Sequence, residues 1–172
     1  MMLKGLLKQG MGSFFEFANA SKELADIERG IQSVKENKFE LIIGTGGASI
    51  MDCAKLIAFG FYHQSDLWDY IKGEKNSNGL EKLPLILMPT YPTSGSEYGL
   101  SAVSVDSRIN DFGTAYGIPA DTAILTPKYS MSLDKEMTAY TGIVTLVQLS
   151  ASTIGDKKPV SYDIGFRSYA ML

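Results

Sequence analysis

Apolar and polar residues in the first half of the chain alternate between a helical and a strand-like period. Residues 21–36 carry apolar side chains three and four positions apart, which predicts an amphipathic helix with Ser21 as its cap. The side chains expected on its buried face are Leu24, Ile27, Ile31 and Val34. Residues 39–43 and 83–88 are short apolar runs typical of buried strands, and residues 49–60 follow a helical pattern. Strands that alternate with helices in this way predict an α/β fold with a parallel sheet.

The second half of the sheet region has a different pattern. Residues 64–82 are largely polar around Trp68, and we interpret them as a surface excursion in which Trp68 is a packing anchor. Residues 98–105 and 112–118 are expected to pair as a hairpin, and residues 122–125 form a further short strand.

Two helices are expected near the C-terminus. Ser132 caps a helical pattern that runs to about residue 153, and Asp134 favours its first turn because a carboxylate complements the helix dipole there. A last helix is expected over residues 159–172. Near the other end of the chain, residues 14–17 (FFEF) have the pattern of a strand.

Composition restricts the class of protein. The chain has 172 residues, 45% hydrophobic and 20% charged, which is enough for one full domain and part of another. Its net charge of −3 and the lack of a Lys/Arg cluster argue against a nucleic-acid partner. We expect no membrane span, and the single Cys53, a small buried apolar residue, favours a reducing compartment, so the cytoplasm is the expected location.

The most informative segment is GTGGASIMDCAK, residues 44–55, between a predicted strand and a predicted helix. Gly46 and Gly47 let the backbone approach a ligand, and the first N–H groups of the helix point at it, so a nucleotide or dinucleotide is the expected guest. The alternative is a glycine turn that serves only geometry. In that case Ser49 and Asp52 form a capping box.

Lys55, one turn further along this helix, is expected to be solvated or to pair with Asp52 at a spacing of three residues.

A second polar loop, PTYPTSGSE over residues 89–97, follows the predicted strand 83–88. In an open α/β sheet, ligands bind at the carboxyl ends of the strands, so both loops are expected at the same edge of the sheet. The alternative interpretation of this loop is a Ser/Thr/Pro turn without a ligand.

Four segments together resemble the iron-containing (group III) alcohol dehydrogenases. GTGGASIMDCAK is similar to the family's GGGSxxDxAK, and PTYPTSGSE to its PTTxGTGSE. Residues 123–127 (AILTP) resemble its ailDP strand, and residues 138–142 (TAYTG) its TAxxG segment. The resemblance implies a Rossmann-like dinucleotide-binding domain over residues 1–128, and over residues 129–172 the first two helices of an incomplete all-α metal domain.

The resemblance also implies a function and a set of cofactor residues. The expected reaction is hydride transfer between NAD or NADP and a small alcohol or aldehyde. By position, Gly46, Gly47 and Ser49 hold the pyrophosphate and Asp52 supports the turn, with Ala48 in place of the third glycine. Thr90 and Ser94 match hydroxyl positions that line the cofactor. Tyr91 replaces a threonine and is expected to reshape the cleft.

The metal site is where this chain departs from the family. Its members bind iron or zinc through one aspartate and three histidines, of which the first two ligands lie in a GxDxxxH stretch. Here Val144 and Gln148 occupy these two positions, and valine cannot bind a cation. The sole histidine, His63, is expected at a helix end, so no catalytic or metal residue is assigned.

Three hypotheses follow. The first is a family nucleotide-binding domain whose dehydrogenase activity is absent or depends on something outside the chain. The second is a working alcohol or aldehyde reductase completed by a homodimer or by a complementing C-terminal polypeptide. The third is a non-catalytic interaction protein. The sequence leaves open whether the chain is a fragment or a reduced relative, and whether it uses NAD or NADP.

Overall fold

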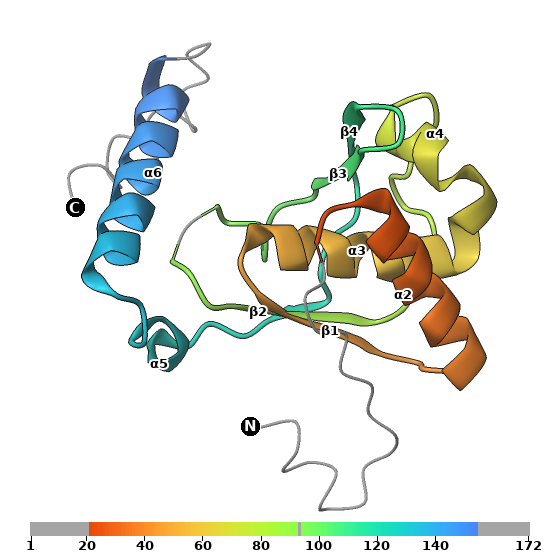
Figure 1. Ribbon diagram of the computed structural model, residues 1–172, viewed down its shortest axis with the longest axis horizontal. Coiled ribbons are helices and arrows are strands. Elements are labelled where there is room, and N and C mark those ends of the chain that lie inside the picture. The colour runs from red at the N-terminus through yellow and green to blue at the C-terminus, as the bar shows by residue number, and fades with distance from the viewer. Residues whose placement is uncertain (1–20, 93, 155–172) are drawn as a thin grey trace, which may run out of the picture.

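The described part of the protein is an α/β molecule built on a three-stranded parallel sheet (Figure 1). The computed structural model describes residues 21–92 and 94–154. The sheet contains β1 (Ile42–Gly46), β2 (Leu85–Pro89) and β5 (Thr122–Ala123), in the order β1-β2-β5. Strands β1 and β2 pair along their full length, with Ile42 opposite Leu85 and Gly46 opposite Pro89. The predicted fold class of a parallel sheet with flanking helices is confirmed.

Helix α3 (Ala48–His63) lies along the sheet, and α2 (Leu24–Asn37) packs against α3 (Figure 1). Leu85 and Leu87 of β2 are fully buried, and Gly44 allows α3 to approach, because a Cβ at Gly44 would lie 2.7 Å from the Cβ of Ala54. The four side chains predicted for the buried face of α2 are all in the core, namely Leu24, Ile27, Ile31 and Val34. The helical spacing therefore identified the packing face of α2 correctly.

The bounds of α2 and β1 differ from the prediction. Ser21 does not cap α2; its hydroxyl accepts a hydrogen bond from Glu23 N (3.1 Å) and donates one to Asp26 (2.6 Å) before the helix begins. Strand β1 begins at Ile42 and not at residue 39, because Phe39 N donates to Val34 O (3.1 Å). Phe39 thus belongs to the C-terminal cap of α2, which Lys38 closes with a left-handed conformation (φ 56°).

The expected hairpin is confirmed as β3 (Ala102–Asp106) and β4 (Asp111–Ala115), an antiparallel pair. It packs on α3 and on the short α4 (Leu67–Ile71), which follows the 3₁₀ turn η1 (Gln64–Asp66). Segment 64–82 is therefore more than a surface excursion. Leu67 and Ile71 are core residues, and Trp68 is partly buried and packs against the core as predicted.

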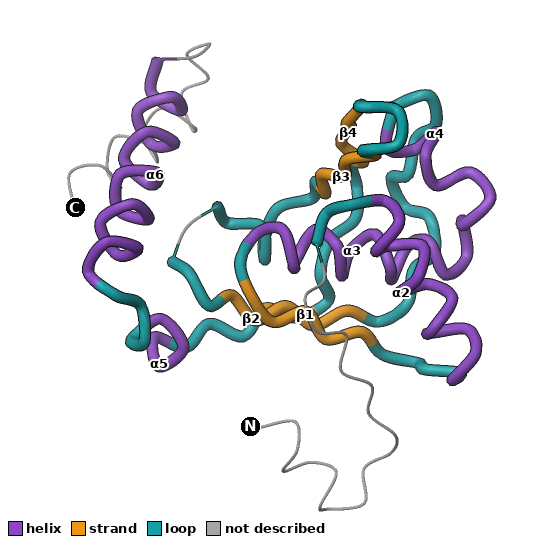
Figure 2. The backbone as a smooth tube through the Cα atoms, viewed as in Figure 1, coloured by secondary structure: helices purple, strands orange, loops and turns teal. Residues whose placement is uncertain are grey.

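The chain leaves the sheet through α5 (Pro127–Ser130) and ends, in its described part, with α6 (Lys135–Ile154). Helix α6 stands apart from the sheet, as the backbone trace in Figure 2 shows. Asp134 caps this helix by accepting a hydrogen bond from Met137 N (2.7 Å), so the prediction of Ser132 as the cap is wrong. Ser132 instead donates weakly to Tyr129 O (3.4 Å).

Two predicted elements, the strand over residues 14–17 and the helix over residues 159–172, lie outside the described residues. Among the helices of residues 21–92 and 94–154, none is both long and apolar enough to cross a membrane.

Candidate functional site

The glycine turn forms a sharp junction between β1 and α3. Strand β1 ends at Gly46, and Gly47 is the N-cap of α3 without a side-chain capping bond. Gly46 has φ 156°, and a Cβ there would lie 2.8 Å from Cγ1 of Ile50, so the position favours glycine. The capping-box alternative for Ser49 and Asp52 is wrong, because the helix begins before Ser49 and leaves it exposed in the first turn.

Three consecutive N–H groups of this turn have no hydrogen-bond partner among the described residues. The N–H groups of Ile50 and Met51 both donate to Gly47 O, each at 3.1 Å. Within the described part of the chain, no group accepts a hydrogen bond from the N–H of Gly47, Ala48 or Ser49. These donors lie at the positive end of a 16-residue helix, which is the arrangement that binds phosphate oxygens.

The second polar loop, residues 89–97, which we call the hydroxyl loop, lies beside this turn, as expected for loops that follow parallel strands. The N–H of Thr90 donates to Gly46 O (3.0 Å), which joins the two loops at the carboxyl ends of β1 and β2. Thr90 and Ser94 are half-buried. Ser94 has a left-handed backbone (φ 67°), and its Oγ accepts a long hydrogen bond from Ser96 N (3.4 Å). The expected shared edge of the two loops is confirmed.

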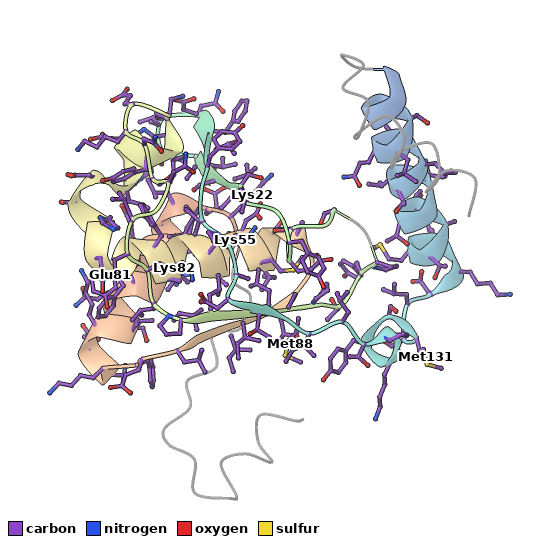
Figure 3. The ribbon with its side chains drawn as sticks, turned by 180° about the vertical axis from the view of Figure 1, so that it is seen from behind. Lys22, Lys55, Glu81, Lys82, Met88 and Met131 are labelled. Atoms are coloured by element: carbon purple, nitrogen blue, oxygen red, sulfur yellow. The ribbon has the colours of Figure 1, made fainter. Side chains whose placement is uncertain are left out.

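Lys55 is fully buried, so the prediction of a solvated lysine is wrong. Its Nζ donates to Gly99 O (2.8 Å), Ser101 O (2.9 Å) and Ser96 Oγ (3.2 Å). Figure 3 shows Lys55 near the centre of the molecule, on α3 and beside the chain that leads into β3. Burial lowers the pKa of Lys55, and the carboxylates of Asp52 and Glu97 oppose this shift.

Asp52 completes the same network from the preceding turn of α3. One carboxylate oxygen accepts from Ser96 Oγ (2.7 Å), and the other from Val103 N at the start of the hairpin (3.2 Å). Asp52 and Lys55 do not form an ion pair with each other at a hydrogen-bonding distance; they meet through Ser96. Through Asp52 and Lys55, helix α3 therefore fixes the position of the hydroxyl loop relative to the hairpin.

A sequence signal for the burial of Lys55 exists. Helix α3 is apolar on nearly every side, and such a helix is buried all round, so a lysine within it has to find partners inside the protein. The neighbouring Cys53 is buried for the same reason, because it lies on this all-round buried helix. It is buried as predicted, and burial raises the pKa of its thiol to about 12.

The positions that match the family's metal ligands lie on α6. Val144 and Gln148 are exposed and one turn apart. Among the described residues, no three His, Cys, Asp or Glu side chains gather in a way that suits a metal ion. His63 ends α3, where its ring stacks on Phe59 (4.4 Å between centroids) and Nε2 lies 3.0 Å from Glu81 O. Within residues 21–92 and 94–154, the side chains at and around these positions do not fit an iron or zinc site.

Comparison with known proteins gives one consistent result. The family model for iron-containing alcohol dehydrogenase matches residues 2–127. The chain is 29% identical to NADH-dependent butanol dehydrogenase A of Clostridium acetobutylicum over 141 residues, which are 78% of this chain and 35% of that protein. It is 37% identical to long-chain-alcohol dehydrogenase 1 of Geobacillus thermodenitrificans over 122 residues, 69% of this chain and 30% of that protein.

The fold agrees with a solved structure. The crystal structure of NADH-dependent butanol dehydrogenase A from Thermotoga maritima superposes with a TM-score of 0.84 at 21% identity, covering 97% of this chain and 43% of that one. The chain spans about a third of the length of the curated relatives it matches.

Proposed function

This chain belongs to the iron-containing alcohol dehydrogenase family, and on that premise we propose that it forms the dinucleotide-binding part of an NAD(P)-dependent dehydrogenase. One observation carries the proposal. Three unpaired N–H groups at the N-terminus of α3 lie on the same edge of the sheet as the Thr90 loop. A butanol dehydrogenase among its relatives is NADH-dependent by name, which supports a nicotinamide dinucleotide as the ligand.

Each predicted cofactor residue has a role in this proposal. Backbone donors at Gly47, Ala48 and Ser49 bind the diphosphate, and Gly46 provides the turn that exposes them. Thr90 and Ser94 line the neighbouring part of the cofactor. Asp52 is a positioning residue that acts through Ser96 and Val103.

The cofactor, when bound, accepts or donates a hydride at its nicotinamide, and the substrate is a small alcohol or aldehyde. Because the described residues do not fit a metal, we assign no step to iron or zinc. The buried free thiol of Cys53 agrees with the reducing cytoplasm that we propose as the location.

Fluorescence titration with NADH and NADPH tests the proposal, with Ser49→Glu as the informative variant. A glutamate in the first turn of α3 suits the helix dipole, so the variant is expected to fold normally. The same carboxylate repels a diphosphate, and we expect at least a tenfold loss of affinity. Ser132→Glu adds the same charge at an exposed position away from the turn and serves as the control.

Two outcomes count against dinucleotide binding. One is an absence of binding by both nucleotides at millimolar concentration. The other is equal affinity of the Ser49→Glu and Ser132→Glu proteins, since a diphosphate at the α3 N-terminus requires them to differ. The preferred nucleotide in the same titration distinguishes NAD from NADP as the cofactor.

A specific observation favours a completing partner for this chain. Large apolar side chains are exposed along α6, and four of them at spacings of three and four form one stripe: Met137, Tyr140, Val144 and Val147. A stripe of this kind on a protein surface marks an interaction site. We propose that its partner is a complementing C-terminal polypeptide that resembles the part of the related dehydrogenases outside the matched region.

Co-expression with the C-terminal two thirds of a related butanol dehydrogenase tests this partner. We expect a one-to-one complex in size-exclusion chromatography. Val144→Glu prevents its formation because a carboxylate in the stripe is buried without a counter-charge. Thr138→Glu, at an exposed position on the side of α6 opposite these apolar residues, leaves the complex intact.

Other results of the co-expression favour the other hypotheses. A chain that is already a dimer on its own, and that Val144→Glu dissociates, supports the homodimer instead. A complex that binds NADH, contains no stoichiometric iron or zinc and reduces no aldehyde supports a non-catalytic nucleotide-binding remnant.

A further inference from the structure

The ring of Tyr91 lies against the glycine turn. A Cβ built on Gly47 would lie 2.8 Å from Cδ2 and 2.9 Å from Cε2 of Tyr91, so the ring fills the space that the missing side chain of Gly47 leaves open. Glycine at such a turn normally lets a ligand approach the backbone. Here the aromatic ring makes that approach instead.

The backbone beside Tyr91 is held in place. Thr90 donates its N–H to Gly46 O (3.0 Å) at the end of the β1–β2 ladder, so the chain before Tyr91 cannot move away without breaking this bond. Tyr91 as a whole residue is 38% exposed, so its side chain is not enclosed by the protein. Rotation of the side chain is therefore the motion by which the space over Gly47 becomes free.

We propose that Tyr91 is an aromatic gate over the diphosphate position, and that a dinucleotide binds to the N–H groups of Gly47, Ala48 and Ser49 only after the ring rotates away. This inference rests on the proposed function, because it concerns access to the same turn. The gate lowers the affinity for every ligand that carries a diphosphate, since each binding event has to give up the contact between the ring and Gly47.

Isothermal titration of the 172-residue chain with NADH, and separately with sodium pyrophosphate, measures the effect of the gate without any need for catalysis. Tyr91→Thr removes the ring, keeps a hydroxyl and restores the residue that the family pattern has at this position. We expect it to bind both ligands about tenfold more tightly than the unmodified protein. Tyr91→Phe, which keeps the ring, binds like the unmodified protein, and the larger ring of Tyr91→Trp weakens binding.

Tyr98→Thr is the matched control, because Tyr98 lies in the same loop and is 68% exposed. It leaves both affinities unchanged. Circular dichroism and urea unfolding measure whether each variant folds. If Tyr91→Thr does not fold, the affinities of Tyr91→Phe and Tyr91→Trp test the gate.

The results separate the gate from the function on which it rests. Equal or weaker binding of both ligands by Tyr91→Thr, with clear binding by the unmodified protein, overturns the gate and leaves dinucleotide binding intact. Binding by Tyr91→Thr alone supports both. Absence of binding by all the variants overturns the proposed function and the gate with it.

Discussion

Replacement of Lys55 by methionine lowers the free energy of unfolding by about 3 kcal/mol. Methionine has nearly the same length and volume, so the packing within α3 changes little. The loss arises because the carbonyls of the half-buried Gly99 and Ser101 lose the donor that Lys55 provides, and each carbonyl left unsatisfied away from water costs about 1–3 kcal/mol. Equilibrium unfolding in urea, followed by circular dichroism, measures the difference.

Lys35 on the neighbouring α2 is the matched control. Its side chain is exposed and donates to Gln64 at the surface (2.8 Å), so Lys35→Met changes the stability by no more than about 0.5 kcal/mol. A loss at Lys55 as small as that at Lys35 contradicts the structural role. Because Lys55 also holds Ser96, we expect the Lys55→Met protein to bind NADH more weakly even at temperatures where it is folded.

A second large effect is expected at Gly113, where replacement by alanine destabilises the protein by about 2 kcal/mol. A Cβ at Gly113 would lie 2.9 Å from the carbonyl carbon of Ile71 and still closer to its oxygen. Ile71 ends α4 and is buried, so this backbone cannot move aside cheaply. The hairpin has to shift instead, and it carries Val103, which donates to Asp52.

Gly142→Ala provides the comparison for Gly113→Ala. A Cβ at Gly142 meets no atom within 4 Å, and Gly142 lies within α6, where alanine favours the helix by up to about 1 kcal/mol. Replacement of glycine by alanine is thus expected to lower the free energy of unfolding at Gly113 and to raise it at Gly142. Urea unfolding of both variants checks this, and a stable Gly113→Ala protein shows that the contact between hairpin and α4 is dispensable.

Local periodicity was sufficient to predict the buried residues of an amphipathic helix. The spacing within α2 identified its four core residues, because a helix buries the side chains that its 3.6-residue period brings together. The shared edge of the two polar loops also followed, since parallel strands end on the same side and the bond from Thr90 to Gly46 joins them there.

Predictions failed where a partner comes from a distant part of the chain or from the adjacent element. Phe39 is of a residue type that favours strands, yet its N–H donates to Val34 O in the C-terminal cap of α2. Strand β1 therefore begins only at Ile42. Ser49 has the spacing of a capping residue, but β1 pairs with β2 up to Gly46, and the N-cap of the helix is Gly47, two residues before Ser49. The assignment of individual residues to the cofactor stays a prediction.

By itself, the sequence determined the fold class and the meeting of a glycine turn and a hydroxyl loop at one edge of a sheet, because periodicity, turn residues and strand direction are local properties. The family followed from the resemblance of four segments to its motifs. Only the tertiary structure decided the role of Lys55 and the location of the Tyr91 ring. Two partners of Lys55 are backbone carbonyls 44 and 46 residues away, and Tyr91 reaches Gly47 from the loop that follows the neighbouring strand β2. Contacts of this kind depend on how the loops close over the helix, which no local spacing encodes.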